Sequence, residues 1–555
     1  MAAADRGALA QRVDQHVEAI WGSVNPGLSD SLISSVGIGR PGDVGSSVER
    51  WTESDIALIT YGDSIRGNGT PLAALATLVH DRLAESFGIV HILPFAPYSS
   101  DRGFAVIDYR AVDPALGSWA DVGRLERDVD LMFDLVANHI STKSDWFQQF
   151  LAHEEPGRDF IFTADPDDDL SAVVRPRSLP LLTPFETADG PKHVWTTFSD
   201  DQADLDWSNP NLVCEMLQIV DLYIRNGARF LRLDAIAFLW KEAGTTSVHL
   251  PQTHEFVKLL RTLLAVRAPH VAILTETNVP DAENRSYFGN GDEAHLIYNF
   301  TLPPLLVDGV LQGRAERLAD WLTNAPPPPA GTTLFNFLAS HDGIGVRPAE
   351  GFLSDDEIAE LVEFAHARGG LHGTYDRAGV PYPYELNISL PDLFGGPDDP
   401  HMPARVLLAH TVVLSLAGVP AIYINSLLGT QNDHAAVEAD GVRRSINRSS
   451  VELTDVPARA GEGWQAVLMQ SMLDLAQKRR RQPAFHPDAP QSVEADGALL
   501  CIRRGSDGES ITVLCNLGDT PITADVPGAW RDLLHSRSGV DRIELDAYDC
   551  AWLVG

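Results

Sequence analysis

Cysteine is scarce in this chain: four residues, Cys214, Cys501, Cys515 and Cys550, are spread over 555 positions. No two of them have the CxxC spacing of a zinc site or a redox motif, and their wide separation does not suggest a disulfide framework. We therefore expect small buried hydrophobic side chains at these positions and no metal site built on thiolates.

Long uninterrupted apolar segments are also missing. The longest apolar run, VLLAHTVVLSLAGVPAIYI, is broken by His410, Gly418 and Pro420, which is typical of a buried helix, a turn and a strand rather than a membrane span. The first residues, MAAADRGALAQRVDQHVEAIW, are polar and helix-like, and they lack the apolar core and cleavage site of a secretory signal. We expect a cytoplasmic protein with no membrane partner.

Positive charge is the third scarcity. The chain has 42 basic against 77 acidic residues, a formal net charge of -35 and a pI near 4.7. Such a field repels nucleic acids and anionic membrane surfaces, so no nucleic-acid partner is expected. An anionic ligand would have to be captured by local cations against the overall field.

Strand-length apolar runs recur along the chain with helical patterns between them, as in a parallel sheet that is buried on both faces. Eight such runs are present, in the order DIALITYGD, GIVHILPF, DLMFDLVANH, GARFLRLDAI, HVAILTETN, AHLIYNF, TTLFNFLASHDG and GVPAIYINS. Eight parallel strands with crossover helices predict an α/β fold, a (β/α)8 TIM barrel, whose chemistry lies at the C-terminal ends of the strands.

The spacing and composition of these runs predict the domain limits. We expect a helical extension over 1–50, a barrel domain over 51–477 and a small antiparallel β domain over 478–555. Between the third and fourth strands, about 143–205 is longer than a helix and two loops require, which predicts an inserted subdomain. The segment of about 352–394, rich in Gly, Pro and Tyr, predicts loops over the barrel mouth.

Polar groups gather where these apolar strands end. They are Asp134, Asn138 and His139 after the third strand, Arg232 and Asp234 in the fourth, Glu276 after the fifth, and His341 and Asp342 after the seventh. A structural ion pair would explain any one of them taken alone. Carboxylates from three different strands on the functional face of a barrel instead predict one shared catalytic cavity.

Converging carboxylates without a metal motif are typical of glycoside chemistry, in which one carboxylate attacks the anomeric carbon and a carboxylic acid protonates the leaving oxygen. Arg232, two residues before Asp234, is expected on the same face of the strand, where it favours the charged form of Asp234. Glu276, in the uncharged setting ILTETN, is the better candidate for the protonated general acid.

The motifs DLVANH, FLRLDAIAF, ILTETN and FLASHDG resemble, in order, the four best-known regions of the alpha-amylase superfamily of retaining glycoside enzymes, and the likeness covers nearly the whole chain. The resemblance implies that Asp234 is the nucleophile, Glu276 the acid/base and Asp342 a stabiliser of the transition state. It also implies that His139, Arg232 and His341 contact the glucosyl unit.

Within that superfamily the chain resembles the sucrose phosphorylase branch through ITYGD, HILPF, RPRSLP, KEAGTTS, LPPLL, SHDGIG and SINR. The resemblance implies a glycosyltransferase that cleaves an α-glucoside with inorganic phosphate by double displacement and releases α-D-glucose 1-phosphate. In the glucosyl pocket it implies that Asp101 and Arg448 clamp the terminal hydroxyls, that Phe104 is a stacking wall and that Gln202 lies near the catalytic centre. Core packing for Phe104 and a loop role for Gln202 are the alternatives.

Phosphate requires cationic or hydroxyl donors beside the glucosyl enzyme. By resemblance to the RPRPG segment of sucrose phosphorylases, Arg177 in VVRPRSLPLL is expected to hold phosphate, together with Tyr384 in PYPYELNIS. A surface charge on an insertion is the alternative for Arg177.

The tyrosine loop departs from the sucrose phosphorylase pattern, because Glu385 stands where that pattern has glutamine. TETNVP, FLASHDGIG and PYELN, with the N-terminal extension, look closer to the glucosylglycerate phosphorylases, whose acceptor is a small hydroxy acid. Such an acid needs a cation in the acceptor pocket, and Arg377 in GGLHGTYDRAGVP is the candidate. Phosphorylases of sucrose, sucrose 6'-phosphate and glucosylglycerol use a similar scaffold and remain alternatives.

Two further interpretations stay open: a hydrolase or transglucosidase of the same fold, and a catalytically inactive barrel used for binding. The mechanism needs no cofactor, since inorganic phosphate is a substrate, and no metal. The acidic run DPDDD, Asp165 to Asp169, is better explained as a solvated loop than as a calcium site. The expected partners are a small glucoside and phosphate, with the chain as a monomer or homodimer.

Overall fold

A computed structural model describes residues 3–23, 25–39, 50–176, 179–377, 379–458, 461–506 and 508–555. Its centre is a closed barrel of eight strands, all paired in parallel, in the order β1-β16-β12-β11-β10-β9-β4-β3. The strands are β1 (Ala57–Thr60), β3 (Ile89–Ile92), β4 (Asp130–Val136), β9 (Ala228–Asp234), β10 (Ala272–Thr275), β11 (Leu296–Tyr298), β12 (Thr333–Asn336) and β16 (Val419–Tyr423). Each lies within one of the eight apolar runs, so the TIM-barrel prediction is confirmed.

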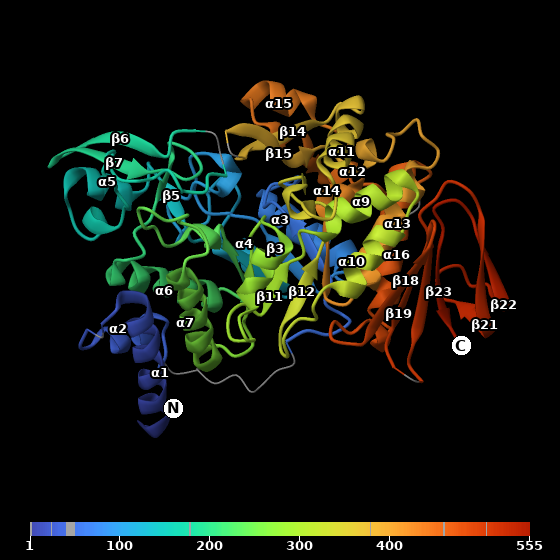
Figure 1. The fold of residues 1–555 in the computed structure, drawn as a ribbon, viewed down its shortest axis with the longest axis horizontal. Helices are drawn as coiled ribbons and strands as arrows, with labels where there is room; N and C mark the ends of the chain where they lie inside the picture. Colours follow the sequence, from blue (N-terminus) through green and yellow to red (C-terminus); the bar gives the residue numbers. More distant parts are fainter. Residues whose placement is uncertain are drawn as a thin grey trace.

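Helices surround this barrel (Figure 1). They are α3 (Pro71–Leu78), α4 (Trp119–Leu125), α6 (Pro210–Arg225), α7 (Pro251–Arg267), α8 (Asp281–Arg285), α9 (Leu302–Gln312), α10 (Glu316–Asn324), α13 (Met402–Ser415), α14 (Ile424–Leu428) and α16 (Trp464–Arg479). Helix α6 shows why they form: the Asn209 side chain caps its start, Pro210 occupies the first turn, and its apolar residues recur at helical spacing on the buried face.

An excursion follows β4 and forms one end of the molecule in Figure 1. It contains β5 (His139–Ser141), α5 (Asp145–Ala152), the hairpin β6 (Leu182–Thr187) and β7 (Gly190–Trp195), and β8 (Gln202–Asp204). Strand β8 returns antiparallel to β5, with His139 opposite Asp204. This pairing brings the start and the end of the excursion back to the end of β4.

The segment after β12 also contains regular structure where the sequence suggested loops. Strand β13 (Ile344–Gly345), helix α11 (Asp355–Ala367) and the hairpin β14 (Leu371–Arg377) and β15 (Val380–Asn387) precede the short helix α12 (Leu390–Leu393). The three strands form a sheet in the order β13-β15-β14. Local features explain the difference: Ser354 and Glu357 form a capping box, and Tyr375 pairs across the hairpin with Tyr382.

The C-terminal strands form one antiparallel sheet in the order β18-β19-β20-β23-β21-β22, at the opposite end of the molecule from the β6–β7 hairpin (Figure 1). They are β18 (Gln491–Asp496), β19 (Leu499–Arg504), β20 (Ile511–Asn516), β21 (Ile522–Asp532), β22 (Ser538–Leu545) and β23 (Cys550–Val554). The buried Trp552 and Arg504 join this sheet to the barrel, because both donate hydrogen bonds to Ser415 at the end of α13.

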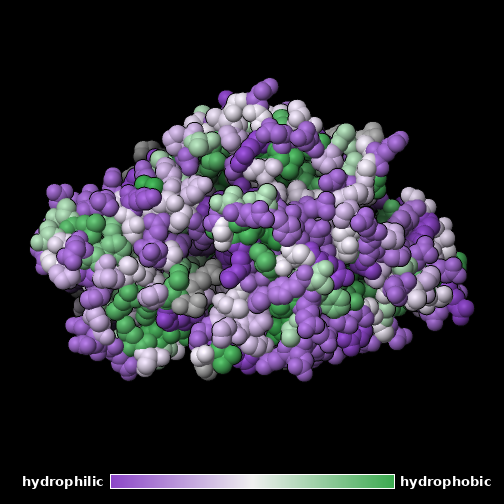
Figure 2. Space-filling model, turned by 90° about the horizontal axis from the view of Figure 1, so that it is seen from above, coloured by the Kyte–Doolittle hydropathy of each residue, from purple (hydrophilic) through white to green (hydrophobic). Residues whose placement is uncertain are grey.

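Two N-terminal helices, α1 (Ala3–Trp21) and α2 (Leu28–Ser35), pack on the barrel helices α7 and α6. His16 contacts Glu255 and Thr262 of α7, and the Trp21 ring packs edge-on against Phe256. Hydrophilic residues predominate on the face shown in Figure 2, and hydrophobic residues form scattered groups. Among the described residues no helix is long and apolar enough to cross a membrane.

Candidate active site

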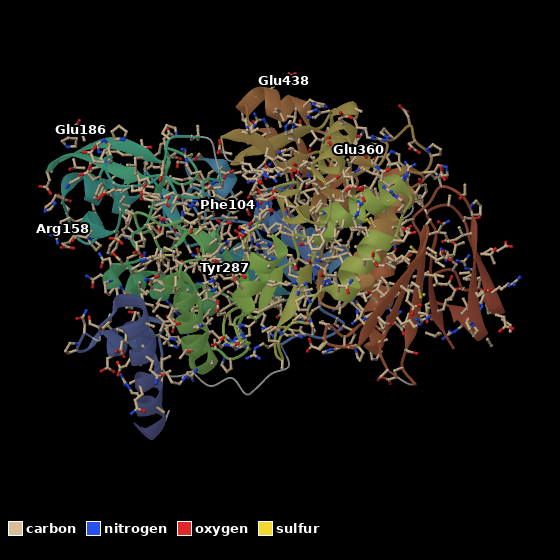
Figure 3. The ribbon with its side chains drawn as sticks, viewed as in Figure 1. Phe104, Arg158, Glu186, Tyr287, Glu360 and Glu438 are labelled. Atoms are coloured by element: carbon tan, nitrogen blue, oxygen red, sulfur yellow. The ribbon has the colours of Figure 1, made fainter. Side chains whose placement is uncertain are left out.

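A pocket of about 750 Å³ opens at the C-terminal ends of the barrel strands. Asp234 is the last residue of β9, and Glu276 follows β10 directly. Asp342 follows β12 after a short loop. All three carboxylates line the pocket, as do Asp101, Phe104, His139, Gln202, His341 and Tyr384. Phe104 lies near the centre of the molecule in Figure 3.

Arg232 joins the carboxylates of two strands. Its Nη1 lies 2.9 Å from Asp234 Oδ1 and also contacts Asp134, while its Nη2 is 4.0 Å from Glu276 Oε2. His91 Nε2 lies 2.7 Å from the other oxygen of Asp134, so both acceptor oxygens of that buried carboxylate are used. Arg232 is 1 % exposed, and a guanidinium removed from water in this way persists only because the carboxylates balance its charge.

Asp234 and Glu276 share one electrostatic environment. Burial raises the pKa of both carboxyl groups, the neighbouring negative charges raise them further, and Arg232 opposes the rise. Because Arg232 is 2.9 Å from Asp234 but 4.0 Å from Glu276, it favours the negative charge more strongly on Asp234 than on Glu276. The arrangement therefore suits a nucleophile and a general acid.

The residue after Asp234 places Glu276. Ala235 has a φ of 54°, in the left-handed region that a residue with a Cβ adopts at a cost. This backbone directs the Ala235 amide toward Glu276 Oε2, at 3.4 Å. The sharp turn thus links the end of β9 to the carboxyl at the end of β10.

Aromatic rings form one wall beside Asp342. The Phe104 ring stacks on His341 with centroids 5.1 Å apart and an interplanar angle of 8°, and Tyr61 meets His341 edge-on. His341 Nε2 lies 3.3 Å from Asp342 Oδ1. Burial and nearby arginines lower the pKa of His341 well below its usual value, so the ring is neutral and can donate or accept hydrogen bonds without adding charge.

His139 lies against Phe104 and Gln202. Its Nε2 donates to the Phe104 carbonyl at 3.0 Å, and Gln202 lies 3.1 Å from the same nitrogen. Behind it, Asn138 binds Asp204 at 3.0 Å and Lys241 at 2.9 Å, and Lys241 pairs with Asp204 at 3.0 Å. This buried network supports the histidine from the side away from the pocket.

The structure brings together Asp101 and Arg448, the two residues that the family resemblance implies form a clamp on the glucosyl unit. Arg448 Nη1 lies 3.6 Å from Asp101 Oδ1, its Nη2 is 3.5 Å from Asp342 Oδ1, and its Nε donates to the His341 carbonyl at 2.8 Å. Asp101 keeps 31 % of its side chain exposed, so a ligand can reach it.

The acceptor candidates separate in the structure. Tyr384 lines the pocket, and Glu385, one residue on, is buried. Arg377 lies at the tip of the β14–β15 hairpin, where it pairs with Asp355 at 3.2 Å, stacks on Tyr382 and does not line the pocket. Arg177 lies outside the described residues, and Pro176, which precedes it, lines the pocket.

Three polar residues of the pocket were not predicted from the sequence. Arg444 binds Glu385 through two nitrogens, at 2.6 and 2.8 Å, and Asp342 at 2.5 Å. Arg347 and Asn278 line the same pocket. The sequence contains only weak indications of these residues. Arg444 belongs to VRRSINR, a basic cluster in an acidic chain. Arg347 directly follows SHDGIGV, and Asn278 is two residues beyond Glu276.

The described residues contain no group of three or more His, Cys, Asp or Glu side chains arranged to hold a metal ion. In the acidic run, the backbone amides of Asp165 and Asp167 bind carboxylates of the same turn. This turn is exposed on the excursion after β4.

Comparison with known proteins gives matches over most of the chain. Residues 87–321 match the catalytic domain of alpha-amylase, and residues 489–552 match a domain of unknown function. A glucosylglycerate phosphorylase from Allomeiothermus silvanus is 43% identical over 518 residues, 91% of this chain and 92% of that protein. A sucrose phosphorylase from Agrobacterium vitis is 30% identical over 85% of this chain and 97% of that protein. Among solved structures, the sucrose 6F-phosphate phosphorylase from Thermoanaerobacter thermosaccharolyticum has a TM-score of 0.73 at 26% identity, covering 84% of this chain and 94% of that one.

Proposed function

We propose that this chain, which belongs to the glycoside phosphorylases of the alpha-amylase family, cleaves 2-O-(α-D-glucosyl)-D-glycerate with inorganic phosphate. The products are α-D-glucose 1-phosphate and D-glycerate. The chemistry rests on one observation above all: Asp234, Glu276 and Asp342, from three different strands, line a single pocket in which Arg232 binds one of them and approaches another. Glycerate as the acceptor rests on the 43% identity to a glucosylglycerate phosphorylase.

In the first step Asp234 attacks the anomeric carbon and the bond to the glycerate oxygen breaks. Glu276 gives its proton to that oxygen, so D-glycerate leaves as a neutral alcohol at its 2-position and Glu276 becomes ionised. Arg232 keeps Asp234 charged before the attack. Asp342 lies beside the forming oxocarbenium-like centre and binds the glucosyl hydroxyls together with His341.

In the second step phosphate attacks the same carbon from the face that glycerate left, and the ester bond to Asp234 breaks. Glu276 accepts the proton of the attacking phosphate oxygen, and the two inversions give net retention. We assign the phosphate contacts to Arg177 and Tyr384, because a guanidinium and a phenol provide charged and neutral donors. We assign the glucosyl contacts to Asp101, Phe104, His139, Gln202, Arg232 and Arg448. No cofactor takes part in either step.

Glu385 is proposed to shape the acceptor pocket through Arg444 rather than to bind substrate. Both of its oxygens are taken by the Arg444 guanidinium, and one also accepts from Asn387 at 3.1 Å. A carboxylate bound in this way has little capacity left for an acceptor hydroxyl.

The test is an acceptor panel. The purified protein is incubated with α-D-glucose 1-phosphate and, separately, D-glycerate, glycerol, fructose, fructose 6-phosphate or water, and phosphate release is followed. Rapid release with D-glycerate alone supports the proposal. Release with fructose, its 6-phosphate or glycerol instead assigns a sucrose, sucrose 6'-phosphate or glucosylglycerol phosphorylase. Equal release in water identifies a hydrolase, and no release with any of them points to a barrel used for binding.

A further inference from the structure

We infer that Arg347 binds the carboxylate of the acceptor and so determines the preference for a hydroxy acid over a neutral alcohol. This inference rests on the proposed function, since it assigns a group to its acceptor. The sequence indicated Arg377 and not Arg347 for this role, and Arg377 does not line the pocket.

The position of Arg347 follows from the sheet at the barrel mouth. Strand β13 pairs with β15, and the amide of Val346 donates to the Tyr384 carbonyl at 2.9 Å, which brings Arg347 beside the tyrosine loop. Arg347 then begins a short 3-10 turn and lines the pocket together with Glu276 and Asp342. Its side chain is therefore anchored at the edge of the site and half-buried.

Charge balance distinguishes Arg347 from the other arginines of the site. Arg232, Arg444 and Arg448 each lie within ion-pair distance of two or more protein carboxylates. Within the described part of the chain, Arg347 makes no ion pair and no hydrogen bond through its guanidinium, and its Nε is buried without a partner. Arg347 acts on Glu283 only at longer range, where it helps to lower the pKa of that carboxyl. In a chain with a net charge of -35, an arginine beside the catalytic carboxyls that forms no ion pair within the described residues is available for an anionic ligand.

The neighbouring acids are already engaged by other groups. Glu350 accepts a hydrogen bond from Tyr375 at 2.6 Å, and Glu283 pairs with His249 at 3.3 Å. The Arg347 guanidinium lies over the Tyr375 ring, 5.0 Å from its centroid. This stacking limits the orientations of the guanidinium and leaves its edge free to form a two-point contact with a carboxylate.

A second polar group beside Arg347 also lacks a partner. The Asn278 side chain packs so closely on Gly345 that a Cβ there would lie 2.8 Å from Asn278 Oδ1. That oxygen is buried and has no hydrogen-bond partner among the described residues. A carbonyl oxygen accepts a hydroxyl proton, so Arg347 and Asn278 together match a carboxylate and the free hydroxyl of D-glycerate.

Distance in the substrate supports the same assignment. In glucosylglycerate the carboxylate is bonded to the carbon that carries the glycosidic oxygen, so it must lie close to Glu276, which protonates that oxygen. Asn278 and Arg347 both line the same pocket as Glu276. Among the described residues that line the pocket, Arg444 is the other arginine, and Asp342 and Glu385 already bind it.

The test compares Arg347→Gln and Arg347→Lys with the wild type in two reactions. The first is phosphate release from α-D-glucose 1-phosphate with D-glycerate or with glycerol, which lacks the carboxylate. The second is exchange of isotope-labelled phosphate into α-D-glucose 1-phosphate, which requires the glucosyl enzyme and no other acceptor. Arg368→Gln is the matched control, because Arg368 stacks on Phe364 and donates to its carbonyl, away from the pocket lining.

In Arg347→Gln we expect kcat/KM for D-glycerate to fall about 10- to 100-fold, as for the loss of hydrogen bonds to a charged group. The rates with glycerol and of phosphate exchange should stay within about 3-fold, Arg347→Lys should be intermediate, and the control should match the wild type.

Three outcomes would overturn the inference. Unchanged use of D-glycerate by Arg347→Gln refutes the assignment and leaves the proposed function intact. An equal fall in phosphate exchange means that Arg347 serves phosphate or the fold and not the carboxylate. A wild-type enzyme that exchanges phosphate but does not prefer D-glycerate to glycerol refutes the proposed acceptor, and the inference fails with it.

Discussion

Replacing Arg444 with methionine should destabilise the protein, because among the described residues this arginine is the one cation paired with Glu385. Its guanidinium binds both Glu385 oxygens, at 2.6 and 2.8 Å, and Asp342 at 2.5 Å. The side chains of Arg444 and Glu385 are 15% and 4% exposed, so water screens this pair little. Methionine retains much of the buried volume but leaves the Glu385 charge without a counter-ion.

The magnitude follows from burial. Two unit charges about 4 Å apart attract by about 4 kcal/mol at an effective dielectric constant of about 20. Removing one partner of a buried pair typically costs about 3–5 kcal/mol, because the other charge stays buried. We expect a loss of this size in the free energy of unfolding at pH 8. Asp342 contributes less to the loss, since Arg448 remains 3.5 Å from it.

Urea unfolding at pH 8 would measure this loss. The second variant is Arg444→Met with Glu385→Gln, which removes the unpaired charge and should recover more than half of the loss. Arg443→Met is the matched control, because Arg443 is adjacent and exposed, and its effect should stay within about 0.5 kcal/mol. An equal loss in the single and double variants would refute the charge argument and indicate a packing defect.

Three further outcomes are expected. Glu276→Gln should lower kcat for phosphorolysis about 10²- to 10⁴-fold. It should also abolish the alkaline limb of the pH–rate profile, because burial raises the pKa of Glu276 and this acid is protonated only below its pKa. If steady-state kinetics still show the alkaline limb, another group is responsible for that limb. Arg377→Gln should change kcat/KM for D-glycerate less than about 2-fold, because Arg377 is 46% exposed and bound to Asp355; a large fall would restore it as the acceptor cation. Lys241→Met should lower the free energy of unfolding in urea by about 3–5 kcal/mol, because it leaves the charge of the buried Asp204 without Lys241 as its partner. The double variant Lys241→Met with Asp204→Asn should recover part of this loss. A loss below about 1 kcal/mol would show that the Lys241–Asp204 pair contributes little to stability.

The barrel and the positions of its three carboxylates could be predicted from the sequence because both are local properties. An apolar run of strand length marks each of the eight strands, and a polar residue at the end of such a run lies at the C-terminal rim whichever strand is its neighbour. Asp234 and Glu276 were therefore found without knowledge of the strand order. The TIM-barrel strands in the structure coincide with all eight runs.

Pairing between distant side chains could not be predicted in this way. Arg444 and Glu385 are 59 residues apart, and no local pattern relates them. Nor does a local pattern distinguish Arg347 from Arg377, since both are arginines in the segments after β12 near the barrel mouth. The register of the β14–β15 hairpin places Arg377 opposite Val380 at the tip, whereas the β13–β15 pairing directs Arg347 to the pocket.

The sequence by itself thus determined the barrel and the carboxylates at its rim, because hydrophobic periodicity encodes where a strand begins and ends. Only the tertiary structure decided which of the described cations pair with those carboxylates and which of them forms no ion pair. The pairing of charges depends on the positions of strands and turns and on the register of the hairpin. A charge more than fifty residues away affects a carboxylate only after folding has brought the two groups within a few ångströms of each other.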